Sequence, residues 1–136
     1  GLYSRVLERY ASTGAIPLQD LLRPDRPVAE CLAALLEQAA RHYAADPGAA
    51  GCMVIEGIRS NDPDARQAAC AYQVAAEAVI RDFIAARFPE EAERLTDFVG
   101  TIMAGLSAQA RNGHSLERLV ATARLAGQAV AQTLAG

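Results

Sequence analysis

The chain has 136 residues, which suffices for one domain with an apolar core that depends on neither disulfides nor metals. Hydrophobic residues make up 51% of it, largely as alanine, the strongest helix former, so the composition favours helices. The formal net charge is −3, lysine is absent, and the arginines are scattered among acidic residues, which argues against a nucleic-acid-binding face in this chain.

The cysteine pattern argues against both disulfides and a metal centre. Cys31, Cys52 and Cys70 form an odd set without close pairing, and they lack the tight ligand spacing of a zinc site even when His42 is included. Buried, unreactive thiols in a reducing cytoplasm are therefore expected. The sequence shows no signal peptide and no apolar run near the ~20 residues of a membrane span, so no membrane partner is expected.

The first half of the sequence predicts helices separated by proline- and glycine-rich breaks. A helix is expected near Leu2–Ala11, ended by Gly14, and a short helical turn follows at 16–22. Pro27 suits a first helical position, and residues 28–45 carry an apolar stripe with spacings of three and four. The members of this stripe are Val28, Cys31, Leu32, Leu35, Leu36, Ala39 and Tyr43.

The middle segment 51–59 is apolar nearly all round, so it is expected to be buried on most sides. Asp62-Pro63-Asp64 predicts a strong helix start, because it combines a capping aspartate, a proline at the first position and an acid facing the helix dipole. This helix is expected to reach about Phe88.

The last third of the sequence predicts two further helices and no strand. Pro89-Glu90-Glu91 is expected to open the first of them, and Asn112-Gly113 to close it. Ser115 is expected to cap the final helix, with Glu117 in its first turn. No two-residue alternation or hairpin turn appears anywhere, which predicts an all-α fold.

The final helix carries a narrow apolar seam in steps of four and three, which is typical of a coiled-coil contact. The penultimate helix offers small residues of its own at Ala104, Gly105 and Ala108. These features predict self-association of the last two helices as a homodimer. The interface is predicted to contain Phe98, Ile102, Gly105, Leu116, Val120, Ala123, Gly127, Val130 and Leu134.

Several side chains are candidates for binding a small molecule. Glu56 interrupts an apolar segment and could anchor a ligand, although exposure to solvent or pairing with Arg59 is the simpler interpretation. Methionine and aromatic side chains suit adaptable apolar pockets, but at helical spacing they are more often ordinary core. The predicted ligand-binding residues are Met53, Glu56, Tyr72, Gln73, Phe98 and Met103.

Nothing in the sequence predicts catalysis or a cofactor. There is no arrangement of nucleophile, base and orienting group, no phosphate-cradling glycine loop and no paired catalytic carboxylates. His114 follows Gly113 in a turn without an evident partner, so a role in sensing pH is not expected. The prediction is that the chain is not an enzyme.

Three stretches together resemble the C-terminal domain of tetracycline-repressor-like (TetR family) transcriptional regulators. Residues 1–10 look like the helix that follows the DNA-binding module in that family. Residues 51–66 are similar to the mid-domain helix and loop, and residues 105–115 look like the turn between the final two helices. The resemblance covers essentially the whole chain.

The resemblance implies a compact all-helical bundle of about six helices, in which residues 1–136 form a single effector-binding and dimerisation domain. The last two helices of each subunit would form a four-helix bundle, and an unknown small-molecule effector would occupy an internal apolar cavity. Operator DNA would be bound only through a helix-turn-helix module that is missing before Leu2. Two alternatives stay open: a small helical enzyme using Glu56 as an acid in an apolar pocket, and a helical interaction module without a ligand.

Overall fold

The computed structural model describes residues 16–45 and 63–135, except for the side chains of residues 64–66 and 68–73. The described residues contain helices and no strand, which confirms the predicted all-α class. The helix predicted near Leu2–Ala11 and the buried segment predicted at 51–59 lie outside the described residues. The described helices are α2 (Leu18–Leu21), α3 (Val28–Ala45), α5 (Pro63–Ala85), α6 (Ala92–Arg111) and α7 (Leu116–Ala135).

The turn between α6 and α7 shows how the local sequence sets the helix ends. Gly113 has a φ of +90°, and its N–H donates to the carbonyl of Ala110 while the N–H of His114 donates to that of Gln109. This is the pair of bonds of a Schellman motif, which favours glycine because a Cβ is unfavourable at positive φ. Ser115 Oγ then accepts the N–H of Arg118 at 3.3 Å, which confirms the predicted cap of α7.

Two helix starts differ in how well the sequence predicts them. α5 begins at Pro63, as predicted. α6 begins at Ala92 rather than at the predicted Pro89, because Phe88 to Glu91 form a turn in which the Glu91 N–H donates to the Phe88 carbonyl. No side-chain hydrogen bond caps α6 at Glu91. The acidic residues Glu90 and Glu91 therefore do not fix the position at which α6 begins.

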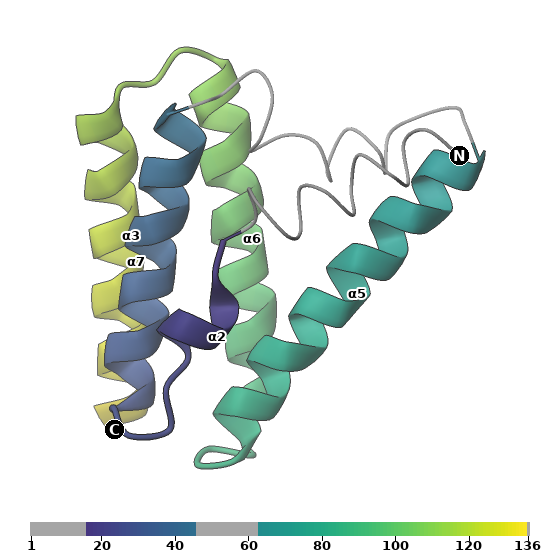
Figure 1. Cartoon of the computed structure of the whole chain (residues 1–136). Helices are drawn as coiled ribbons and strands as arrows, with labels where there is room; N and C mark the ends of the chain where they lie inside the picture. The colour runs from purple at the N-terminus through teal and green to yellow at the C-terminus, as the bar shows by residue number, and fades with distance from the viewer. Residues whose placement is uncertain (1–15, 46–62, 136) are drawn as a thin grey trace.

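Helices α3, α6 and α7 run side by side, while α5 crosses obliquely and packs against α6 through its C-terminal half (Figure 1). α3 has the most extensive contact with α7 and also packs against α6. α2 is a single turn that lies against α3. The C-terminal end of α5 and the N-terminal end of α3 lie at the same end of the bundle. The α6–α7 turn lies at the opposite end (Figure 1).

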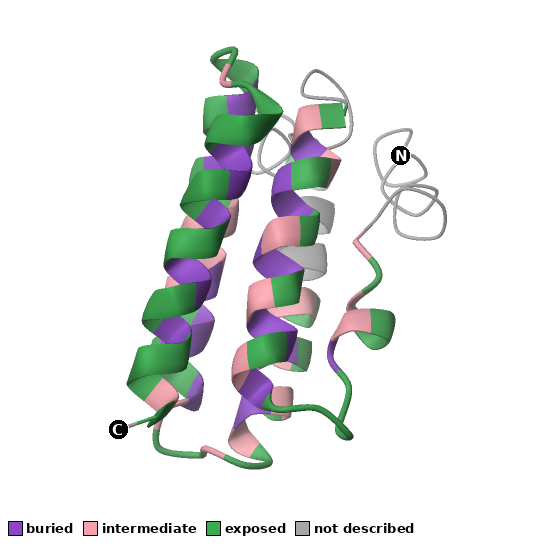
Figure 2. Cartoon of the chain, turned by 90° about the vertical axis from the view of Figure 1, so that its left-hand side faces the viewer, coloured by how far each residue is buried: buried purple, intermediate pink, exposed green. Residues whose placement is uncertain are grey.

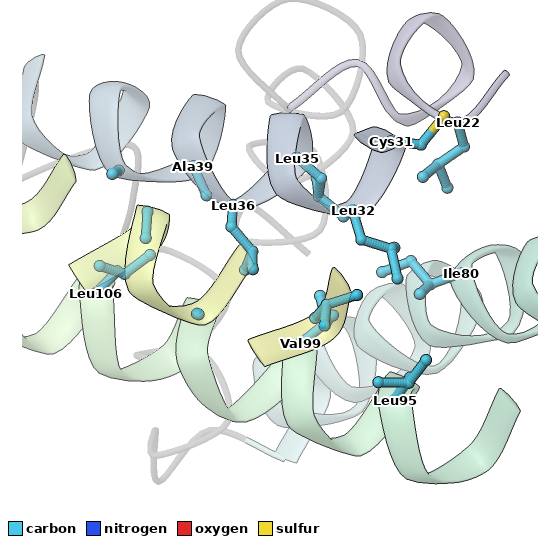
Figure 3. Packing of buried hydrophobic residues seen from close by; sticks show 14 of the residues in the cluster. Leu22, Cys31, Leu32, Leu35, Leu36, Ala39, Ile80, Leu95, Val99 and Leu106 are labelled. Carbon is cyan, nitrogen blue, oxygen red and sulfur yellow. The ribbon is translucent and has the colours of Figure 1, made fainter. Parts of the chain in front are cut away.

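The core lies between α3, α6 and α7, and α5 adds to it from its C-terminal half. The predicted stripe of α3 is buried as a whole, with Leu32, Leu35 and Leu36 fully inaccessible. Figure 3 shows Leu32 pointing toward Ile80 of α5, and Val99 and Leu106 of α6 in the same cluster. Helices α3, α6 and α7 turn their buried sides inward and their exposed sides outward, as Figure 2 shows, so the amphipathic periodicity of the sequence builds this core directly.

Candidate functional site

The structure describes only part of the predicted ligand-binding set. Met53 and Glu56 lie outside the described residues. Tyr72 and Gln73 belong to α5, but their side chains are not among those described. Phe98 and Met103 are described on α6, and both are half-buried side chains packed against the edge of the core. The complete pocket therefore remains a prediction.

The middle of α6 is less buried than its two ends. Val99 and Leu106 are at most 2% exposed. Ile102 and Met103, which lie between them on the same helical stripe, are only half-buried. Phe98, one turn before Ile102, is half-buried too. This flank offers adaptable apolar side chains at the boundary between core and surface, which is the chemistry expected of an apolar ligand site.

The predicted seam of α7 packs against α3 of the same chain rather than against a second copy. Ala123 is fully buried and Val130 is 1% exposed within a single chain. A Cβ built on Gly127 would lie 3.0 Å from the Cβ of Ala33, so at this point α7 approaches α3 of the same chain closely. Val120, at 7% exposure, is buried too.

The assignment of Val120, Ala123, Gly127 and Val130 to a surface between two copies is thereby corrected. A heptad-like seam specifies that another helix lies against it but does not say which one. Here the complementary stripe of α3 occupies it. At the ends of the seam, Leu116 remains 43% exposed and Leu134 is half-buried.

The outward sides of α6 and α7 share a different property, which is the absence of charge. No charged residue occurs between Phe98 and Ala110, and between Leu119 and Ala135 the only one is Arg124. We call these two exposed sides the uncharged face. Its exposed members are Thr101, Ala104, Gly105, Ala108, Ala121, Thr122, Leu125, Ala129, Gln132 and Thr133.

Two features of the uncharged face favour contact with another helix. Leu125 is 68% exposed, the most exposed large apolar side chain on α7. A Cβ built on Gly105 would meet nothing within 4 Å, so this part of α6 is open. Small exposed residues let helices approach closely, and charged residues are depleted at the centres of protein interfaces. Gly105 is exposed on the penultimate helix, and its place in a dimer interface stays a prediction.

An open groove of about 420 Å³ lies along the other border of α7, where it meets α3. Across it, Arg124 Nε donates to Glu37 Oε1 at 2.9 Å, and Arg41 Nη2 donates to Glu37 Oε2 at 3.4 Å. The hydrogen bond from Arg124 is the main reason that the pKa of Glu37 is lowered from its usual value. None of the predicted ligand-binding residues lines this groove. Its lining consists of Ala33, Ala34, Glu37, Arg124, Gly127, Gln128 and Ala131.

Sequence reasoning missed the pairing of Glu37 with Arg124, because the two residues are 87 positions apart. The pairing of Glu37 with Arg41 was open to prediction from their i,i+4 spacing.

Cys31 is buried at 2% exposure, as expected, and its thiol donates to the Arg23 carbonyl at 3.6 Å. No helix in the described ranges combines the length and hydropathy of a membrane span.

Comparison with known proteins identifies a close relative. The chain is 58% identical over 130 residues, 96% of its length, to the HTH-type transcriptional repressor BdcR of Escherichia coli (strain K12). The chain spans 66% of that protein's length. No family model matches the chain, and no solved structure matches it.

Proposed function

We propose that this chain is the effector-binding and dimerisation part of a transcriptional repressor with the architecture of the tetracycline-repressor-like family. The observation that carries the proposal is the 58% identity to a repressor over 96% of the chain. The net charge of −3 and the absence of lysine agree with a part that regulates DNA binding without contacting DNA itself.

The proposed dimer contact is the uncharged face. It replaces the seam of α7 as the surface that a second copy would cover, and it keeps the last two helices as the elements of a four-helix bundle. A pair of such faces related by a two-fold axis would bury Leu125 and bring small residues of α6 and α7 against each other. Pairing would hold two DNA-binding heads at a fixed separation, which operator recognition demands because half-sites lie roughly 34–36 Å apart.

The proposed effector site adjoins the half-buried flank of α6 at Phe98, Ile102 and Met103. An effector alters DNA affinity only if it binds one form of the dimer more tightly than the other. A site between α5 and α6 would meet that condition if its occupation changed how α5 lies against the core. The effector class supported by these side chains is a mainly apolar small molecule.

A chimeric repressor tests the proposal directly. This chain would replace the matching 130 residues of BdcR, and repression of a reporter under the BdcR operator would be measured. We expect repression comparable to that by BdcR, because the DNA-reading part is retained and the proposed dimer contact is supplied by this chain. A folded, stably expressed chimera that fails to repress would contradict the proposal.

The matched control separates dimerisation from folding. Gly105→Arg places a long charged side chain in open space on the uncharged face, so the chimera should stay folded but lose repression. Gln38→Arg adds the same side chain to the exposed side of α3 and should leave repression unchanged. Equal repression by both variants would remove the uncharged face from the proposal.

The effector site has its own test. A thermal-shift screen of apolar small molecules against the chain should find compounds that raise the Tm, since a ligand specific to the folded state stabilises it. Met103→Trp should abolish the shift by filling the site from a half-buried position. A shift that survives in the folded variant would place the site elsewhere.

A further inference from the structure

The loop between α2 and α3 is tied to the end of α5 by one side chain, Arg87. Its Nη1 donates to the carbonyl of Arg26 at 2.5 Å, and its Nη2 donates to the carbonyl of Arg23 at 3.4 Å. Arg87 lies two positions after the end of α5 at Ala85, and its backbone N–H donates to the Ile84 carbonyl. Its guanidinium also lies 5.1 Å from the centre of the Phe83 ring. This cation–π contact favours a fixed orientation of the planar guanidinium group.

The α2–α3 loop is held by contacts from inside and outside it. Pro24 and Pro27 have no N–H to donate, and within the loop the Arg26 N–H donates to the Arg23 carbonyl at 3.2 Å. Besides the Arg26 N–H, the Arg23 carbonyl accepts from the Cys31 thiol and from Arg87. Cys31 belongs to α3 and Arg87 to the end of α5, so this one carbonyl is shared between two elements.

The helix that precedes the loop has little stability of its own. α2 contains four residues, none of them buried, and no side-chain hydrogen bond caps its start. A helix of one turn does not persist without tertiary contacts. Leu22, 8% exposed, is the apolar anchor just after α2, and the bonds from Arg87 fix the backbone directly beyond it.

We propose that Arg87 is a positional latch through which the C-terminal end of α5 sets the position of α2. The latch rests on the proposed function for its regulatory meaning: a displacement of α5 by an effector would reach α2 through the loop. Arg87 acts through the loop carbonyls and touches neither the proposed effector site nor the uncharged face.

Hydrogen exchange of the chain, measured residue by residue, tests the latch without DNA or effector. In Arg87→Gln, the amides of Leu21 and Leu22, which donate to Pro17 and Leu18 carbonyls, should exchange about tenfold faster. The amides in the middle of α3, α6 and α7 should stay within about twofold of wild type, because the core does not depend on the loop.

Two further variants give the experiment its contrast. Arg94→Gln removes an exposed arginine that pairs with Glu91 at the start of α6, and it should leave exchange in α2 unchanged. Arg87→Lys keeps the charge but lacks the planar guanidinium group. It should therefore accelerate the exchange of the Leu21 and Leu22 amides less than Arg87→Gln does.

Either of two results would overturn the latch. One is unchanged exchange at Leu21 and Leu22 in Arg87→Gln, and the other is equal acceleration throughout the core, which would make Arg87 a general stabilising residue. Failure of the proposed function would be seen separately, in the repression assay of the chimera.

Discussion

The two sides of α7 differ in what they contact and in what marks them in the sequence. The side toward α3 is fully buried at Ala123 and is packed so closely at Gly127 that an added Cβ would lie 3.0 Å from Ala33. The opposite side carries Leu125 at 68% exposure and, apart from Arg124, no charge from Leu119 to Ala135. Periodicity marks the buried side, whereas the lack of charge marks the exposed one.

The comparison shows why a seam alone misleads. A regular apolar stripe is needed wherever one helix packs on another, and most such contacts lie inside a single chain. An exposed helix side in a monomer has no comparable reason to avoid charge, because charged side chains keep it soluble. Missing charge on an exposed side is therefore the more informative sign of self-association.

The largest effect is expected from filling the close approach between α3 and α7. Gly127→Arg should destabilise the chain by about 3 kcal/mol or more, because the new side chain must displace the backbone and Cβ of Ala33 rather than a flexible chain end. Urea unfolding followed by circular dichroism measures this. Gly105→Arg on α6 is the control and should change stability by less than about 1 kcal/mol, measured where the chain is monomeric. Equal stability of the two variants would contradict the packing of Gly127 on α3.

A pair of leucines on the two sides of α7 sharpens the comparison. Leu119→Ala should cost about 3 kcal/mol, because Leu119 is 1% exposed and its removal leaves a cavity in the core. Leu125→Ala on the exposed side should cost less than about 0.5 kcal/mol in the monomer but weaken the dimer. Denaturant unfolding at low concentration and sedimentation at high concentration separate the two effects. A large loss of monomer stability in Leu125→Ala would refute the assignment of the two sides.

The smallest effect belongs to the ion pair at the border between the sides. Arg124→Gln should cost about 0.5 kcal/mol at pH 7, because the pair with Glu37 is partly exposed and screened by solvent. The folded-state pKa of Glu37 lies below its usual value of 4.5, so this stability is present above pH 4.5 and is lost as the pH falls through the lowered pKa. Unfolding curves of the two proteins should therefore converge at low pH. A difference that grows on acidification would contradict the pairing.

Much of the fold could be predicted from local patterns. The stripe of α3, the start of α5 at Pro63 and the caps at Gly113 and Ser115 all follow from residues within a few positions of one another. Such signals depend on the periodicity and capping chemistry of the helix itself.

The candidate site was harder to predict, since it depends on which elements meet. The partner of the α7 seam, the hydrogen bond from Arg124 to Glu37 and the latch at Arg87 join residues far apart in the chain. No local pattern encodes these contacts. Gly127 illustrates the limit: its place in the seam was correct, but its neighbour proved to be Ala33 of the same chain.

In the proposed dimer, the uncharged face of α6 and α7 joins two copies of the chain. Sedimentation equilibrium of wild type and Gly105→Arg at micromolar concentration tests it most directly. We expect a mass near twice 14.4 kDa for wild type and near 14.4 kDa for the variant, with unchanged helicity in both. A monomeric wild type, or a Gly105→Arg protein that remains dimeric, would contradict it.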